Sequence, residues 1–294
     1  MHSIGIDIGC TKIKAVAIDA DGNVLHQLYE LTNDGGDKVW KNAVVAAVKE
    51  FQNVLKTEKI NIGLSAPGLP NENNTAIAFM PGRMQGLENL SWKDVLHQPT
   101  YVLNDAVAAM MGEAKFGAAK NKKNVVMLTL GTGVGGAILI DGKPYQGAFK
   151  KAGHIGHMVI NDEGDADITG MPGSLEECIG NCTVEKRSKG KFTSTHELLK
   201  AYKNGDAFSK DVWLKSVRQL AIGLASVTNI LSPEVIVLGG GITQAGSDLF
   251  EPLKEYMNQY EWRAGGNKTE IVQATYGDMA GAIGAAWFAM DFNT

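Results

Sequence analysis

The chain has 294 residues, a formal net charge of −4 and 44% hydrophobic residues, a composition typical of a globular protein with one large domain or two of ordinary size. The acidic balance argues against nucleic acid as a main partner. No apolar run approaches the roughly 20 residues that span a bilayer, and a strand pattern begins at Ser3 without a signal peptide, so we expect a cytoplasmic protein that does not enter a membrane. The three cysteines, Cys10, Cys178 and Cys182, make no disulfide framework.

The N-terminal region alternates apolar runs with turns. Glycine, Asp and Asn residues separate the first runs, and a helical periodicity then places Val39, Trp40 and Val44 on one face. The pattern predicts three strands, a helix and a fourth strand. These five segments are residues 4–9, 13–18, 24–29, 37–55 and 60–65. A rigid turn at 66–70 and a turn-rich stretch at 71–91 follow.

A strand expected at 100–103 runs into Asn104 and Asp105, and an alanine-rich helix follows from 106 to about 116. An aspartate at this junction can have a structural role as the N-cap of the helix. It also stands at the carboxyl end of a strand, where open α/β folds bind ligands. The residues alone leave both roles open. The small, basic segment 117–124 is the best candidate for a domain boundary.

The central stretch 125–140 reads as an apolar strand, a turn with four glycines in six residues, and a second apolar strand. It ends at Asp141 and Gly142, a pair typical of a hairpin. Glycines expose backbone N–H groups, so the turn forms either an anion-binding concavity or a plain tight hairpin. No helix follows the glycines, which excludes a Rossmann or Walker loop.

The N-terminal hairpin follows the same plan as the central one. Aligning Gly9 with Gly131 pairs strand, glycine turn, strand and Asp-Gly turn in both places. This agreement indicates an internal repeat of one supersecondary unit. Two such turns facing each other would hold the phosphates of a nucleotide from both sides.

The C-terminal half adds two weak metal signals and a third glycine-rich turn at 239–243. His154 and His157 lie three residues apart among glycines, a pair that is a metal site less often than not. Cys178 and Cys182 have no matching second pair, which favours two partly buried thiols over zinc. Helices are expected at 195–202, 207–231, 249–260 and 279–289, and strands at 234–238 and 271–274.

Five motifs stand in order along the chain. They are Asp7-Ile8-Gly9-Cys10-Thr11-Lys12, Asn104-Asp105, Leu130-Gly131-Thr132-Gly133-Val134-Gly135-Gly136, Gly153-His154-Ile155-Gly156-His157 and Val237-Leu238-Gly239-Gly240-Gly241. With them the chain resembles, over nearly its whole length, the ROK family of sugar kinases and sugar-responsive repressors. The resemblance implies an α/β, actin-like ATPase fold of the hexokinase (ribonuclease H-like) type, with an ATP-and-sugar cleft between two domains. The implied domains are 1–118 together with a C-terminal helix at about 279–294, and 119–278.

The resemblance implies ATP and Mg²⁺ as cofactors. Asp7 would help to hold Mg²⁺, directly or through water. The first two glycine turns would cradle the phosphates of ATP, and the third would lie against adenosine. The implied nucleotide-binding positions are Gly9, Cys10, Thr11, Lys12, Gly131, Thr132, Gly133, Gly135, Gly239, Gly240 and Gly241.

The resemblance also assigns a base and a sugar site. Asp105 matches the catalytic base, which takes the proton of the sugar hydroxyl that attacks the γ-phosphorus. Asn and His side chains both donate and accept hydrogen bonds, and a carboxylate accepts them from hydroxyls, as sugar recognition requires. The implied sugar-binding positions are Pro67, Gly68, Asn89, Asn104, Asp105, His154, His157 and Glu176.

The chain departs from the family pattern at three places. His154 stands where a Glu that binds sugar hydroxyls is common, and Cys10 stands where a second glycine is usual. The zinc motif Cys-x-Cys-Gly-x-x-Gly-Cys falls on residues 167–174, which keep both glycines and none of the cysteines. The residues in place of the cysteines are Asp167, Thr169 and Ser174. Structural zinc is therefore expected to be lost, and with it the usual metal partner of His157.

The sequence favours an ATP-dependent kinase of glucose or a close relative. A kinase of N-acetylated amino sugars and a non-catalytic sugar-binding protein are the alternatives. The start of the first strand near Ser3 leaves no room for a helix-turn-helix domain, which disfavours a repressor. The resemblance also implies a homodimer, while ATP and polyphosphate both stay open as phosphoryl donors.

Overall fold

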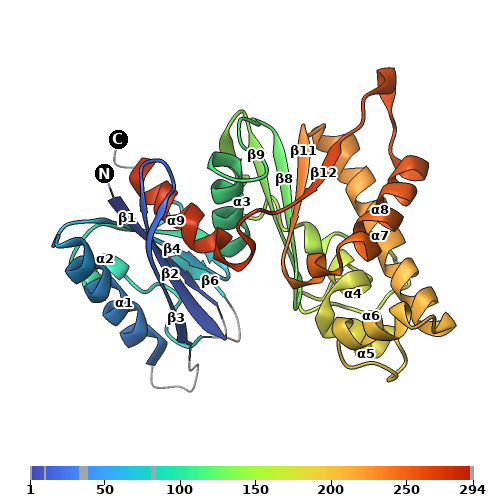
Figure 1. Ribbon diagram of the computed structural model, residues 1–294, viewed down its shortest axis with the longest axis horizontal. Helices are drawn as coiled ribbons and strands as arrows, with labels where there is room; N and C mark the ends of the chain where they lie inside the picture. The colour runs from blue at the N-terminus through green and yellow to red at the C-terminus, as the bar shows by residue number, and fades with distance from the viewer. Residues whose placement is uncertain (1, 10, 33–38, 81–83, 292–294) are drawn as a thin grey trace. The chain divides into compact units, whose positions relative to one another are not determined.

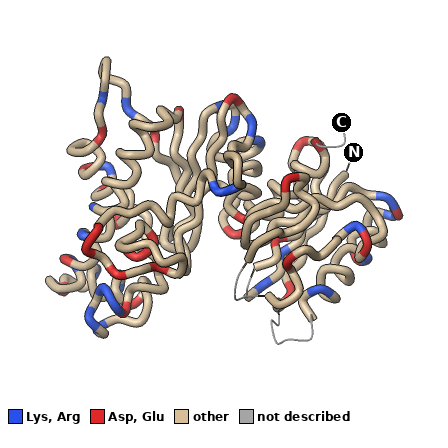
Figure 2. The backbone as a smooth tube through the Cα atoms, turned by 180° about the vertical axis from the view of Figure 1, so that it is seen from behind, with Lys and Arg blue, Asp and Glu red and all other residues tan. Residues whose placement is uncertain are grey.

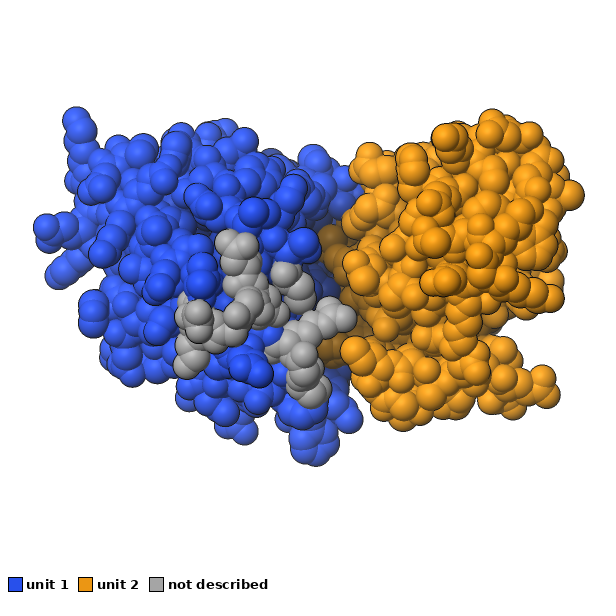
Figure 3. All heavy atoms as spheres, turned by 90° about the horizontal axis from the view of Figure 1, so that it is seen from below, with its two compact units in different colours: residues 1–123, 138–152, 274–294 blue, residues 124–137, 153–273 orange. Residues whose placement is uncertain are grey.

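The computed structural model describes residues 2–9, 11–32, 39–80 and 84–291 (Figure 1). Cys10 and residues 37 and 38 of the expected first helix lie outside these ranges. The chain forms two compact units, which are coloured separately in Figure 3. Unit 1 comprises residues 1–123, 138–152 and 274–294, and unit 2 comprises residues 124–137 and 153–273.

The first sheet has the strand order β3-β2-β1-β4-β7. Its strands are β1 (His2–Ile8), β2 (Lys12–Asp19), β3 (Val24–Leu31), β4 (Asn61–Ala66) and β7 (Thr100–Asn104). β1, β2 and β3 pair antiparallel in succession, whereas β4 lies parallel to β1 and β7 parallel to β4. The parallel strands β1, β4 and β7 therefore end at one edge of the sheet, where Asp7, Ala66 and Asn104 lie. A short separate ribbon pairs β5 (Leu69–Pro70) with β6 (Ile77–Phe79).

The second sheet repeats this plan in the order β10-β9-β8-β11-β12. Its strands are β8 (Val125–Leu130), β9 (Val134–Ile140), β10 (Lys143–Tyr145), β11 (Val235–Gly239) and β12 (Glu270–Gln273). β11 runs parallel to both β8 and β12, as β4 does to β1 and β7. Asp141 and Gly142 both have positive φ, 50° and 76°, the conformation that a tight β9–β10 turn requires. The repeat predicted from the two glycine turns thus extends to the order of all five strands.

The helices follow the predicted apolar periodicity closely. They are α1 (Val39–Leu55), α2 (Trp92–Leu96), α3 (Asp105–Lys115), α4 (Leu175–Ile179), α5 (Val184–Arg187), α6 (Thr195–Lys203), α7 (Ala207–Leu231), α8 (Ser247–Tyr260) and α9 (Ala280–Asp291). In unit 1, Trp40 of α1 and Trp92 of α2 are buried edge to face with ring centroids 6.0 Å apart. In unit 2, α7 buries Trp213, Leu220 and Leu224 in the core.

Two glycines allow α9 to pack directly on the first sheet. A Cβ on Gly5 of β1 would lie 1.8 Å from the Ala282 carbonyl oxygen, and one on Gly63 of β4 would lie 1.9 Å from that of Ala285. Backbone therefore meets backbone where α9 crosses the sheet, an approach that larger residues would prevent. The same face carries α3, which also packs against α9 (Figure 1).

Charge is mixed along both units, with Lys and Arg interspersed among Asp and Glu (Figure 2). This distribution accords with the small net charge of −4. Among the residues that the structure describes, no helix has the length and hydropathy to cross a bilayer.

Candidate functional site

The junction of β7 and α3 presents Asp105. Asn104, the last residue of β7, is the helix N-cap, because its Oδ1 accepts hydrogen bonds from the N–H groups of Ala106 and Val107 at 3.0 and 3.3 Å. Its Nδ2 donates to the Gly68 carbonyl at 3.1 Å. The capping role that the sequence left open for Asp105 thus belongs mainly to Asn104, although Asp105 Oδ1 also accepts from Ala106 N at 2.8 Å.

Asp105 lies in the electrostatic field of a second carboxylate, Asp7. The Asp105 side chain is exposed to solvent, yet desolvation by the surrounding protein and the charge of Asp7 raise its pKa to about 6. Burial also raises the pKa of Asp7, against the opposing effects of Lys14 and Ser65. Ser65 Oγ donates to Asp7 Oδ1 at 2.6 Å, and Lys14 Nζ lies 3.4 Å from Asp7 Oδ2. Two carboxylates with raised pKa values in one unit are typical of a catalytic site.

The other predicted residues of unit 1 lie in turns. Gly68 follows β4 with a φ of +99°, and its hydrogen bond to Asn104 brings the Pro67–Gly68 turn beside Asp105. Gly9 N donates to the Lys12 carbonyl at 3.1 Å, which closes the first glycine turn around Thr11. Asn89 is exposed, has a φ of 56° and is held through its backbone N–H, which donates to Ile77 at 2.7 Å; no side-chain bond joins it to the Asp105 region among the described residues.

In unit 2, the turn between β8 and β9 offers unpaired backbone donors. Gly131 N donates to the Gly133 carbonyl at 2.9 Å. The carbonyls of Gly131 and Thr132 accept from the N–H groups of Asn181 and Cys182 at 3.0 and 2.8 Å, which anchors the turn to the segment after α4. Within the described parts of the chain, the N–H groups of Thr132 and Gly133 have no hydrogen-bond partner. Such a turn presents donors to an anion.

Glu176, predicted to bind sugar, lies against this turn. Its Oε2 accepts from Val134 N at 2.9 Å. A Cβ on Gly133 would approach the same oxygen to 2.2 Å, whereas a Cβ on Gly131 would meet no atom of the described residues within 4 Å. Packing against Glu176 therefore explains why residue 133 is glycine. It does not explain the glycine at 131, whose Cβ position is open. Gly135 follows within β9.

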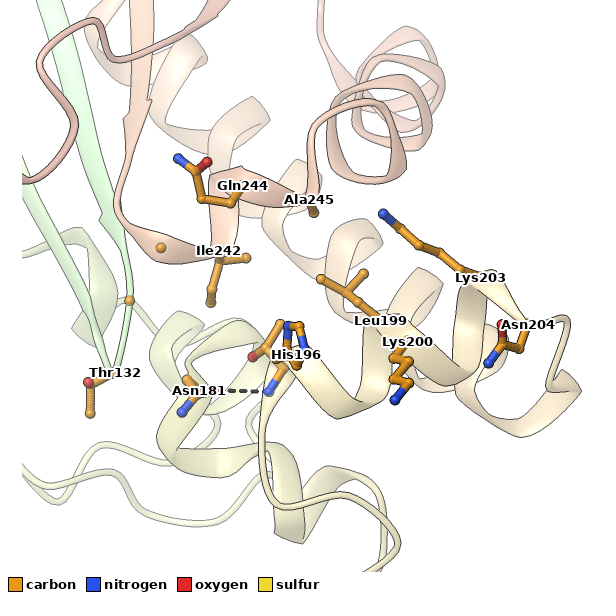
Figure 4. A pocket seen from close by; sticks show the side chains of 13 residues that line it. Thr132, Asn181, His196, Leu199, Lys200, Lys203, Asn204, Ile242, Gln244 and Ala245 are labelled. Atoms are coloured by element: carbon orange, nitrogen blue, oxygen red, sulfur yellow. Dashed lines mark hydrogen bonds between the residues drawn. The ribbon is translucent and has the colours of Figure 1, made fainter.

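A cavity of about 880 Å³ opens beside Gly131 and Thr132 (Figure 4). Figure 4 shows three segments converging on it, namely the turn after β8, helix α6 and the 3₁₀ turn after β11. Its other lining residues are Asn181, Thr195, His196, Leu199, Lys200, Lys203, Asn204, Gly241, Ile242, Gln244 and Ala245. Asn181 Oδ1 accepts from Thr195 N at 2.8 Å, which fixes the start of α6 at the cavity. The volume falls within the usual range for ligand sites.

Of the three glycines predicted to contact adenosine, only Gly241 lines this cavity. Within the part of the chain that the structure describes, a Cβ on Gly241 would meet no atom within 4 Å, as for Gly131. Gly240 has a φ of +88°, and a Cβ there would lie 2.3 Å from the Leu130 carbonyl oxygen, so its role is structural. Gly239 ends β11 and is buried.

The α6 residues were missed by the sequence analysis. Ser194 Oγ accepts from Glu197 N at 3.2 Å, and this Ser-x-x-Glu spacing is a readable start signal for the helix. It does not indicate which face of α6 meets a ligand. That orientation depends on residues outside the helix, through the hydrogen bond from Thr195 N to Asn181 Oδ1 and the burial of Leu198 in the core of unit 2.

His154 and His157 lie at the two ends of one 3₁₀ turn, with rings 6.3 Å apart and nearly parallel at 10°. Burial, and secondarily His157, lower the pKa of His154, so this imidazole is neutral at pH 7. His157 Nδ1 lies 2.9 Å from Asp167 Oδ2. The family's zinc motif falls on the loop that carries Asp167.

The residues at the zinc-motif positions do not fit zinc. Structural zinc takes four nitrogen or thiolate ligands, whereas Asp167, Thr169 and Ser174 supply a carboxylate and two hydroxyls. These groups bond to one another, since Thr169 Oγ1 donates to Asp167 Oδ1 at 2.7 Å. Among the described residues, no three His, Cys, Asp or Glu side chains are placed to hold a metal.

The two remaining cysteines differ in exposure. Cys178 is buried and Cys182 is exposed, so only one matches the prediction of two partly buried thiols. Burial raises the pKa of Cys178 to about 11 and also raises that of Cys182. Neither thiol is therefore activated as a nucleophile.

The sequence model of the ROK family matches residues 3–291. A relative named glucokinase, from Halalkalibacterium halodurans, is 32% identical, with 97% of this chain and 93% of the relative covered. The chain belongs to the ROK family. Other ROK proteins are repressors, and the xylose repressor of Bacillus subtilis is 24% identical over 99% of this chain and 77% of the repressor.

Solved ROK structures match the fold as well. A ROK hexokinase from Thermus thermophilus superposes with a TM-score of 0.88 at 27% identity, covering 100% of both chains. A ROK glucokinase from Streptomyces griseus, solved with glucose and AMPPNP, gives a TM-score of 0.82 at 25% identity, covering 99% of this chain and 100% of the other. The predicted actin-like ATPase fold is thus confirmed.

Proposed function

We propose that this ROK protein is an ATP-dependent kinase that phosphorylates a hydroxyl of glucose or a closely related hexose, with Asp105 as the general base. The observation that carries the proposal is the state of Asp105, which is exposed to solvent and has a pKa raised to about 6. A group with this pKa is ionised at pH 7 and is still basic enough to accept a proton. The kinases among the relatives support the reaction class.

Asp105 takes the proton as the sugar oxygen attacks the γ-phosphorus. The oxygen–phosphorus bond to the sugar forms while the bond from the γ-phosphorus to the leaving ADP oxygen breaks. Phosphoryl transfer depends chiefly on positioning and charge neutralisation. The Asn104 side chain caps α3 and also bonds to the Gly68 carbonyl. These bonds fix the position of Asp105 relative to the start of α3 and to the Pro67–Gly68 turn.

Asp7 is the residue proposed to hold Mg²⁺, directly or through water. Its carboxylate is of the oxygen type that Mg²⁺ prefers, and the second negative charge of Asp105 adds to the attraction for a cation. The metal would neutralise charge on the phosphates when bound. Lys14 and Ser65 orient the Asp7 carboxylate through its two oxygens.

The cavity beside Gly131 is proposed as the nucleotide site. The unpaired N–H groups of Thr132 and Gly133 suit phosphate oxygens, and the open space at Gly131 and Gly241 leaves room for a ligand to approach the backbone. Lys200 at the cavity adds positive charge. Thr11 and Lys12 of the first glycine turn remain phosphate-binding candidates together with Gly9, Cys10 and Gly135.

His154 and His157 are proposed to face the sugar, together with Pro67, Gly68, Asn89, Asn104 and Glu176. A second candidate substrate class, N-acetylated amino sugars, is favoured by one observation. A neutral imidazole at position 154 replaces the carboxylate that is common in the family, which removes a negative charge and a strong acceptor for hydroxyls.

A coupled ADP-release assay with Mg-ATP tests the proposal. The panel is glucose, mannose, fructose, allose, N-acetylglucosamine and N-acetylmannosamine. Because transfer from polyphosphate releases no ADP, that donor is tested separately by measuring formation of the sugar phosphate. We expect saturable turnover with at least one sugar, glucose first. Absence of turnover with every sugar, while calorimetry detects sugar binding, would instead indicate a non-catalytic ROK protein. The homodimer and the domain division at 118/119 and 278/279 remain predictions.

A further inference from the structure

Among the described residues, one ring nitrogen of His157 is engaged by the protein. Its Nδ1 lies 2.9 Å from Asp167 Oδ2, and the exposed fraction of the side chain is 30% for His157 and 0% for Asp167. An ionised carboxylate only accepts hydrogen bonds, so the proton at this contact belongs to His157 Nδ1. The ring nitrogen without this bond, Nε2, is then the acceptor of the neutral imidazole.

Asp167 is itself fixed by the loop around it. Its Oδ1 accepts from Thr169 N at 2.8 Å, Thr169 Oγ1 at 2.7 Å and Met171 N at 3.1 Å. Burial acts to raise the pKa of Asp167, but its hydrogen bonds with Thr169, His157 and Ser174 outweigh burial and leave the pKa well below its ordinary value. The carboxylate is therefore ionised, rigid and unable to donate.

We infer that Asp167 is a positioning residue that keeps the His157 proton on Nδ1, so that Nε2 accepts a hydrogen bond from a sugar hydroxyl. The part of the inference that concerns sugar binding rests on the proposed function. The part that concerns the tautomer of His157 does not. A metal ion on Nδ1 would have the opposite effect, because it would occupy the Nδ1 lone pair and leave the proton on Nε2. The Asp at a zinc-motif position thus changes the sugar-facing nitrogen from a donor to an acceptor.

The variant Asp167→Asn separates this role from a merely structural one. Three donors converge on Oδ1, so the amide oxygen stays on that side and the amide NH₂ faces His157 Nδ1. The NH₂ donates to Nδ1 and forces the proton onto Nε2. We expect the ¹H–¹⁵N spectrum of the imidazole, recorded where His157 is neutral, to change from the Nδ1–H to the Nε2–H pattern. The His157→Gln spectrum identifies the resonance.

The kinetic consequence is specific for the sugar. In Asp167→Asn we expect the KM for the preferred sugar to rise about tenfold, since the hydroxyl that donates to Nε2 loses its acceptor and must turn to accept a hydrogen bond instead. The KM for ATP should stay near that of the wild type. Thr169→Val is the matched control, because it removes a hydroxyl bond to the same carboxylate without touching the His157 contact. It should lower the melting temperature and leave the tautomer and the sugar KM unchanged.

The outcomes of the two measurements are distinguishable. An Nε2–H pattern in the wild type, or one zinc ion per chain in the purified protein, overturns the inference even if the protein is an active sugar kinase. A tautomer change in Asp167→Asn without any change in sugar KM overturns the sugar contact. If no sugar is phosphorylated, the proposed function fails, while the spectrum still decides the tautomer.

Discussion

Asp105 and Asn104 show how two neighbouring polar residues at one helix start divide two tasks. Both residue types cap helices well, so the sequence left Asp105 open between cap and base. In the structure, Asn104 Oδ1 accepts from the N–H groups of Ala106 and Val107, and Asp105 shares the one on Ala106. The division depends on side-chain direction, which no spacing rule predicts, and it leaves the Asp105 carboxylate in contact with solvent.

The pKa of Asp105 predicts the pH dependence of turnover. Desolvation by the surrounding protein, then the charge of Asp7, raise that pKa to about 6, and the base works only when it is deprotonated. We therefore expect kcat/KM to rise with pH through about 6 and to level off above it, falling about tenfold per pH unit on the acid side. The measurement is kcat/KM for the best sugar from pH 5 to 8, with ATP affinity over the same range as the control. A flat profile between pH 5 and 7 would rule out this assignment of the base.

Asp167 is the residue whose role was least predictable. The motif alignment indicated that the zinc cysteines were replaced, but not that their replacements bond to one another. Three hydrogen bonds to one oxygen come from residues two and four positions away, a loop geometry without periodicity. The contact with His157 then spans ten residues.

At the scale of elements, the two glycine turns could be predicted from the sequence because each joins two well-defined apolar strands. The sequence predicted strand, turn and strand in both places, and β1–β2 and β8–β9 occur there. It did not distinguish the glycines that packing requires from those that leave open space. That difference depends on the distant partners Glu176 and Leu130, which lie against Gly133 and Gly240.

A pair of alanine substitutions in the β8–β9 turn tests this difference. Gly131→Ala places a methyl group where none of the described residues has an atom within 4 Å, so the free energy of unfolding should change by less than about 0.5 kcal/mol. The KM for ATP should nevertheless rise about tenfold, because the methyl group occupies space needed by the nucleotide. The measurements are urea unfolding and the ADP-release assay.

Gly133→Ala is the matched comparison. Its Cβ would lie 2.2 Å from Glu176 Oε2, so the bond from Val134 N to that oxygen must distort. The atoms met are the end of the Glu176 side chain, which can turn away, so we expect a loss of about 0.5–1.5 kcal/mol in unfolding free energy, the contribution of one hydrogen bond. Equal stability losses in both variants, or an unchanged ATP KM in Gly131→Ala, would argue against a nucleotide at this turn.

At the scale of the whole molecule, the sequence predicted the architecture more completely than the site. The order of five strands repeats in both sheets, as the hairpin repeat suggested, and α7 spans the predicted residues 207–231. Apolar periodicity determines such elements locally. The cavity, by contrast, is assembled from α6 and two turns far apart in sequence. No sequence pattern therefore predicted that Lys200 and His196 line it.

Asp105 is proposed as the base of a sugar kinase. The most direct test compares the wild type with Asp105→Asn in the ADP-release assay, with sugar binding followed by calorimetry. We expect kcat to fall by roughly 10²- to 10⁴-fold, the usual contribution of a general base, while sugar affinity stays near that of the wild type. Turnover retained at the wild-type level in Asp105→Asn would contradict the claim.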